Sequence, residues 1–147
     1  MHFLAKSAAL AMVILGCASV SVVAADDPIK TRQDLMGGIG KAMKVLVPMA
    51  QGKTAYDAAK ATDALNAVAT NIADFPNHFP AGSDQGKTDA MPAIWEKMDD
   101  FKAHATSLET DAKAALAATA SLDTFKPAFM KMAGNCKSCH EAYRKPS

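Results

Sequence analysis

The chain has 147 residues, 50% of them hydrophobic, and only 3 cysteines, which suits one domain with a buried core and excludes a disulfide-stabilised scaffold. Its 16 Lys and Arg balance 15 Asp and Glu, so the formal net charge of +1 argues against the concentrated basic surface that nucleic-acid binding needs. Alanine and methionine are abundant and aromatic residues make up 6% of the chain, so we expect an all-α fold.

The first 25 residues differ in composition from the rest of the chain. Lys6 is followed by an apolar run that ends in Ala24 and Ala25, just before two aspartates. This pattern is typical of a secretory signal peptide over residues 1–25, so we expect export to the periplasm, cleavage after Ala24 or Ala25 and a functional domain of residues 26–147. Loss of Lys6 leaves 15 basic and 15 acidic residues.

Two other interpretations of this segment also take the protein out of the cytoplasm. A membrane anchor is disfavoured because Gly16 and two serines interrupt the run, which falls short of the roughly 20 apolar residues that a spanning helix needs. A lipoprotein signal would place lipid on Cys17, but Leu15 is bulky for the position before the glycine. We therefore expect no stable membrane insertion after processing.

The first predicted helix covers residues 28–49. Pro28 suits the first turn of a helix, and apolar residues recur at helical spacing: Leu35, Ile39, Met43 and Leu46. Gly37, Gly38 and Gly40 each weaken the intrinsic stability of this helix by about 1 kcal/mol. Packing must therefore hold this stretch, or another group must approach its backbone closely.

The second predicted helix opens with Thr54, whose hydroxyl can cap it together with Asp57 three residues on. Its apolar face consists of Ala58, Ala61, Leu65, Val68 and Ile72. Phe75-Pro76 ends this helix, because the residue before a proline disfavours helical geometry. Residues 75–91 then contain prolines and glycines without periodicity, and a connection of this length is either functional or a crossover between distant helix ends.

The third predicted helix covers residues 92–119, with an apolar face that includes Trp95, Phe101 and Leu108. The fourth takes Asp123 as its cap and has Pro127 in its first turn. It presents one stripe, made of Phe125, Phe129, Met132, Cys136, His140 and Tyr143. Four helices of about 20 residues with mostly short connections predict an antiparallel four-helix bundle.

The motif that carries chemistry is the C-x-x-C-H run from Cys136 to His140. Such a run attaches c-type haem, because two thiols one helical turn apart reach the two vinyl groups of a porphyrin while the next residue's imidazole meets the iron. A zinc site would need four ligands, and the remaining candidates, His78 and His104, lie in other segments. A thiol-redox site would need the motif to open a helix after a strand, and no strand is expected here.

Several segments of the chain resemble the class II cytochromes c, the family that includes cytochrome c′. The resemblance covers nearly all of the exported domain and is carried by Arg32-Gln33, Ala55-Tyr56-Asp57-Ala58-Ala59, Phe79-Pro80-Ala81-Gly82-Ser83, Pro92-Ala93-Ile94-Trp95 and the run from Cys136 to Arg144. The C-terminal position of the motif is typical of this class, since the commoner class I cytochromes c carry it near the N-terminus. The resemblance implies one covalent haem c, held by Cys136 and Cys139 with His140 as the proximal ligand of the iron.

The same resemblance implies roles for four further residues. Arg32 and Gln33 are expected to face the haem edge and its propionates. Arg144 follows His140 by one helical turn and is expected near the proximal ligand. Asp89 matches a haem-contact region loosely. Without the family, Arg32 and Arg144 could equally be solvated surface charges.

Met36 separates two functions. Counted from Arg32-Gln33 without gaps, it falls where cytochrome c′ proteins place an apolar residue over a five-coordinate iron and where the low-spin branch of the class has a methionine bonded to it. The surrounding sequence resembles the low-spin branch, which implies Met36 and His140 as axial ligands and a one-electron carrier. Alternatively, Met36 is one of nine methionines and only fills space, which leaves a five-coordinate site for nitric oxide or carbon monoxide.

Further expectations concern catalysis, the remaining side chains and assembly. The chain contains no catalytic Ser-His-Asp set, carboxylate pair or phosphate loop in a supporting context, so an enzyme is not expected. His78 is expected to be exposed, His104 to be a polar neighbour of the core, and Trp95 to be core or near the porphyrin. Class II proteins often pair through their first two helices, so a homodimer is one state to expect.

Residues 123–147 carry five basic against two acidic residues. This segment is either a docking surface for an acidic redox partner protein or a solvated face.

Overall fold

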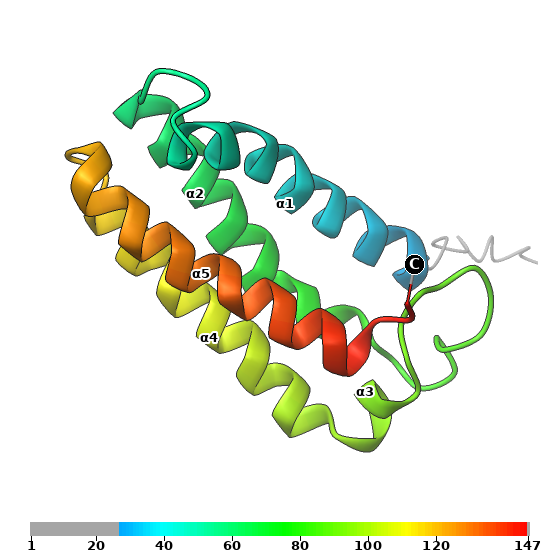
Figure 1. Ribbon diagram of the computed structural model, residues 1–147. Helices are drawn as coiled ribbons and strands as arrows, with labels where there is room; N and C mark the ends of the chain where they lie inside the picture. The colour runs from blue at the N-terminus through cyan, green and yellow to red at the C-terminus, as the bar shows by residue number, and fades with distance from the viewer. Residues whose placement is uncertain (1–26, 147) are drawn as a thin grey trace, which may run out of the picture.

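The computed structural model describes residues 27–146, and Figure 1 shows them as a bundle of helices. The predicted signal peptide and Cys17 lie outside the described residues. Over residues 27–146 the backbone forms no strand apart from one isolated bridge between Ala90 and Arg144, so the expected all-α class is confirmed. None of the described helices is long and apolar enough to cross a membrane.

Helices α1 (Pro28–Ala50) and α2 (Ala58–Asp74) both begin at an aspartate. The Asp27 carboxylate accepts hydrogen bonds from the backbone N–H groups of Ile29 and Lys30, and Asp57 accepts one from Lys60 at 3.0 Å. Thr54 lies in the turn before α2 and does not cap it, so that prediction was wrong by three residues. A short 3-10 helix, η1 (Phe75–His78), follows α2 directly.

The third predicted helix is divided in two. Helix α3 (Ala93–Glu96) ends at Lys97, whose φ of −128° and ψ of 46° break the helical path before α4 (Met98–Ala117) begins. Helix α5 (Leu122–Tyr143) starts at Ser121, which forms a reciprocal capping box with Thr124, and not at the predicted cap Asp123. Pro127 consequently lies inside α5 and not in its first turn.

The four long helices pack in the order α1 against α2, α2 against α4 and α4 against α5, while α1 and α5 contact each other only slightly (Figure 1). The central core is fully buried and includes Leu46, Leu65, Val68, Phe125 and Met132. Since α1 and α2, and α4 and α5, are joined by short turns, neighbouring helices run in opposite directions. The predicted antiparallel four-helix bundle is therefore confirmed.

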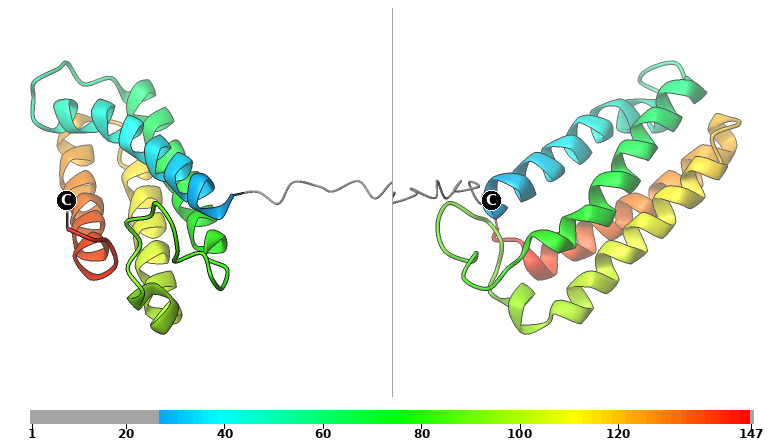
Figure 2. Two further views of the ribbon diagram at one scale, coloured as in Figure 1. Left: turned by 90° about the vertical axis from the view of Figure 1, so that its right-hand side faces the viewer. Right: turned by 180° about the vertical axis from the view of Figure 1, so that it is seen from behind.

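The connection between η1 and α3 crosses the end of the bundle where α1 begins and α5 ends (Figure 2). Gly82 and Gly86 adopt φ values of 80° and 105°, which favour glycine and allow the chain to reverse there. A second buried cluster lies under this connection and consists of Phe79, Ile94, Phe101 and Tyr143. The loop that we call the strap, residues 79–91, is thus packed onto the bundle.

Candidate functional site

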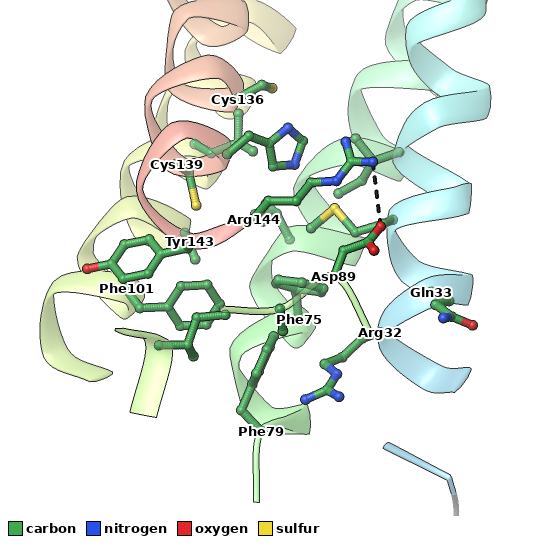
Figure 3. Close-up of a pocket in the computed structure, with 18 of the residues that line it drawn as sticks. Arg32, Gln33, Phe75, Phe79, Asp89, Phe101, Cys136, Cys139, Tyr143 and Arg144 are labelled. Carbon is green, nitrogen blue, oxygen red and sulfur yellow. Dashed lines mark ion pairs between the residues drawn. The ribbon is translucent and has the colours of Figure 1, made fainter. Parts of the chain in front are cut away.

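A cavity of about 510 Å³ opens between α1 and α5 at the strap end of the bundle (Figure 3). Its volume lies in the usual range for sites that bind a cofactor. All eight residues singled out from the sequence line it: Arg32, Gln33, Met36, Asp89, Cys136, Cys139, His140 and Arg144. The structure therefore brings together residues from α1, the strap and α5, of which those on α1 and α5 are about 100 positions apart in the sequence.

The α5 wall carries the C-x-x-C-H motif. Burial raises the pKa of Cys136, and burial together with neighbouring negative charges raises the pKa of Cys139 to about 11. Both thiols are therefore protonated at neutral pH, unlike the low-pKa thiolates of redox motifs. Partial burial, and then the positive charge of Arg144, lower the pKa of His140. This shift favours the neutral imidazole, the form that binds a metal.

The part of the chain that the structure describes contains no set of ligands for a zinc ion. Residues 27–146 contain no group of three or more His, Cys, Asp and Glu side chains arranged to hold a metal ion. His78 pairs with Asp74 at 2.9 Å, and His104 lies 3.7 Å from Asp100. Neither histidine lines the cavity.

The cavity accounts for two of the three glycines on α1, Gly37 and Gly40. A Cβ atom built on Gly37 or Gly40 meets no other atom within 4 Å, and both residues line the cavity, so a flat group could lie directly against this backbone. Gly38 has a different role, because a Cβ there would lie 2.7 Å from the side-chain nitrogen of Asn71 on α2. Gly38 thus allows α1 and α2 to approach closely.

Arg32 is buried, with 4% of its surface exposed, so the alternative of a solvated surface charge is wrong. Its guanidinium donates to the carbonyl oxygen of Ser83 at 2.7 Å and to the Ser83 hydroxyl at 3.1 Å. It also stacks on the rings of Phe79 and Trp95, at 4.5 and 5.7 Å from their centroids. The family resemblance implied that Arg32 faces the haem edge, but no signal in the sequence indicated that it anchors the strap.

The strap is fixed at its other end by the residues that follow α5. Asp89 pairs with Arg144 at 3.7 Å (Figure 3). The backbone N–H of Lys145 donates to the Asp89 carbonyl at 2.8 Å. The N–H of Met91 donates to the Tyr143 carbonyl at 3.0 Å. Gln33 on α1 donates its side-chain amide to the Lys87 carbonyl at 3.0 Å. Arg144 is therefore neither free nor fully solvated.

Aromatic residues that sequence analysis did not assign to the site form one end of the cavity. Phe75, Phe79, Phe101 and Tyr143 line it and contact one another edge to face or tilted. The Tyr143 hydroxyl donates to Asp100, which raises the pKa of Tyr143 to about 12. Trp95 is half-buried, packs edge to face against Phe79 at the margin of the second buried cluster, and lies outside the cavity lining.

Comparison with known proteins gives a consistent result. A family model described as Cytochrome C′ matches residues 27–144. Cytochrome c-556 from Agrobacterium fabrum is 38% identical over 135 residues, which covers 91% of this chain and 92% of that protein. Cytochrome c′ from Rhodopseudomonas palustris is 36% identical over 137 residues, with 90% of each chain covered.

Solved structures agree with these sequence matches. Cytochrome c′ from Rhodopseudomonas palustris superposes with a TM-score of 0.80 at 31% identity, covering 84% of this chain and 99% of that one. A nitric oxide complex of a mutant cytochrome c prime from Alcaligenes xylosoxidans superposes with a TM-score of 0.75 at 29% identity, covering 83% and 96%.

Proposed function

This chain belongs to the cytochrome c′ family and is a c-type haem electron carrier, and we propose that its haem is bonded to Cys136 and Cys139 and ligated by His140. The cofactor is covalent haem c, which contains iron. The observation that carries the assignment of residues is that this motif lines one cavity of about 510 Å³ together with the open backbone of Gly37 and Gly40.

Each side chain of the motif suits its proposed role. Cys136 and Cys139 lie one helical turn apart, the spacing that two thioether bonds to one macrocycle need. The lowered pKa of His140 favours the neutral imidazole, which has a ring nitrogen available to the iron. When bound, the haem supplies an iron that exchanges one electron between the ferric and ferrous states. Apolar residues such as Phe101 and Leu108 limit the access of water.

Met36 is proposed as the second axial ligand. It lines the cavity from α1, while His140 lines it from α5. Methionine ligation favours ferrous iron and raises the reduction potential, and an iron with two protein ligands has no free position for a gas. These properties fit a one-electron carrier better than a catalyst.

A five-coordinate gas-binding site is the second candidate. The lack of any atom near a Cβ at Gly37 and Gly40 gives space beside Met36. One solved relative is a nitric oxide complex. If Met36 only fills space, the same cavity would admit nitric oxide or carbon monoxide to the iron.

Absorption spectra of the oxidised and reduced protein test the two candidates. A low-spin ferric spectrum and poor binding of carbon monoxide are expected for the carrier with Met36 as ligand. A high-spin ferric spectrum with ready binding of carbon monoxide would contradict this ligation and support the gas-binding site. Reversible one-electron reduction in a potentiometric titration tests the carrier function itself.

The cellular location and the oligomeric state of the protein are also proposed. The N-terminal segment supports export to the periplasm, where covalent attachment of haem occurs in bacteria. Pairing of two copies through α1 and α2 is a prediction that sedimentation or size-exclusion measurements would test.

A further inference from the structure

We propose that an acidic electron-transfer protein docks over the surface between α1 and α5, with Met130 at the centre of the contact and four lysines around it. We call this surface the α1–α5 face and define it by its residues: Lys41, Lys44, Lys126, Met130 and Lys137. The inference rests on the proposed carrier function, because it places the partner beside the cavity that lies between these two helices.

Helix geometry joins these residues to the cavity. On α5, His140 and Arg144 line the cavity, and steps of three and four residues toward the N-terminus lead from them to Lys137, Met130 and Lys126. On α1, Gln33, Gly37 and Gly40 line the cavity, and the next residue on that stripe is Lys44. Both stripes therefore continue along α1 and α5 beyond the end of the cavity.

Three of the five basic residues that the sequence suggested as a docking surface, within residues 123–147, have partners in the structure. Lys131 points to the α4 side and pairs with the buried carboxylate of Asp111 at 2.8 Å. Arg144 pairs with Asp89, and the Lys145 ammonium donates to the Thr88 carbonyl at 2.9 Å. Each of these three cations contacts a group of the chain itself, and none of them belongs to the α1–α5 face.

The lysines of the α1–α5 face remain available. Lys41, Lys44 and Lys126 form no ion pair within 4 Å among residues 27–146, and Lys137 has only an exposed contact of 3.7 Å with Glu141. Glu141 and Asp123 are the acidic residues on the same side of α5, so the face keeps a surplus of two positive charges. A surplus of this sign attracts an acidic surface.

Met130 supplies the apolar centre. Its side chain is 59% exposed, more than that of any other large hydrophobic residue in the described part of the chain. Methionine is enriched at protein interfaces, which combine an apolar centre with a polar rim. A planar lipid surface is less suitable, because four lysines contribute only about 1 kcal/mol each and one methionine inserts little apolar area.

Electron transfer from an acidic probe protein tests the proposal. Flavodoxin in its hydroquinone form would reduce the ferric holoprotein in a stopped-flow experiment. Raising the salt concentration from about 10 mM to about 100 mM shortens the Debye length from about 30 Å to about 10 Å, so the second-order rate should fall for the wild type. The variant Lys44→Glu/Lys126→Glu should be about tenfold slower at low salt and less sensitive to salt.

The matched control is Lys97→Glu/Lys102→Glu, which makes the same change of net charge away from this face. It should alter the rate less than twofold. A second measurement follows the methyl signal of Met130 by NMR, which should shift on addition of oxidised flavodoxin and not shift in Lys44→Glu/Lys126→Glu. Far-ultraviolet circular dichroism and haem content verify that each variant is folded.

Three results would overturn the proposal: equal slowing by both double variants, an unchanged Met130 signal, or binding to phosphatidylglycerol vesicles that requires Lys44 and Lys126 while flavodoxin rates do not. Reduction by a small neutral hydroquinone separates this test from that of the carrier function. If that reagent reduces all variants equally and reversibly, the carrier function stands whether or not the docking surface does.

Discussion

The substitution Arg32→Ala tests whether the strap depends on one buried guanidinium. Arg32 is 4% exposed and joins α1 to Ser83 in the middle of the strap. Its removal leaves the Ser83 carbonyl and hydroxyl without the donor that α1 provides and uncovers the ring of Phe79. The expected result is a less stable protein with a strap that opens more often.

The magnitude follows from the contacts. Two charge-assisted hydrogen bonds, at 2.7 and 3.1 Å, contribute about 1.5–3 kcal/mol each. The stacking on Phe79 at 4.5 Å adds about 0.5–2 kcal/mol. Burial of the charge offsets part of this gain, as the lowered pKa of Arg32 indicates. We therefore expect the free energy of unfolding to fall by about 3 kcal/mol.

Urea unfolding of the holoprotein, followed by far-ultraviolet circular dichroism, measures this change, and hydrogen exchange reports on residues 79–91. Arg32→Lys should recover only part of the loss, because an ammonium cannot donate in the same fork geometry. Gln33→Ala is the matched control, since its hydrogen bond to the same strap is exposed and should contribute less than about 1 kcal/mol. Stability of Arg32→Ala within about 0.5 kcal/mol of the wild type would refute the reasoning.

Three further changes have distinct expected outcomes. Met36→Ala should convert the ferric spectrum from low-spin to high-spin, lower the reduction potential and admit carbon monoxide; a wild-type protein that is already high-spin would contradict this. Replacing both cysteines of the motif by alanine should leave little stable holoprotein, because an empty cavity is costly, and covalent haem that survives acid–acetone extraction would disprove the attachment. Gly38→Ala should be about 1–2 kcal/mol less stable than Gly134→Ala in urea unfolding, because only position 38 meets a neighbouring amide at 2.7 Å while both gain helix propensity. Equal stability of these two variants would remove the close approach of α1 and α2 as the reason for Gly38.

Helix boundaries show where local sequence was insufficient. Thr54 and Asp57 are both good capping residues, as are Ser121 and Asp123, and the structure uses Asp57 and Ser121. The choice depends on where the chain turns into the bundle, and that is set by packing. The break at Lys97 was missed for the same reason, since no proline or glycine marks it.

The candidate site was predicted more completely than the helix boundaries. The motif from Cys136 to His140 is contiguous, so its spacing on a helix is visible in the sequence. Arg32, Asp89 and Arg144 were assigned to the cavity through the family resemblance, and all three line it. Their hydrogen-bond and ion-pair partners could not be predicted, because each contact joins segments more than 50 residues apart.

The amphipathic segments and the attachment motif could be predicted from the sequence, because side-chain periodicity and the spacing of the thiols are local properties of a helix. The partners of the charged residues became known only from the packed structure. Lys131, Arg144 and Lys145 contact Asp111, Asp89 and Thr88, so only Lys126 and Lys137 of the basic C-terminal segment belong to the α1–α5 face. Charge pairing depends on distance in space, and the packing of α4, the strap and α5 sets that distance.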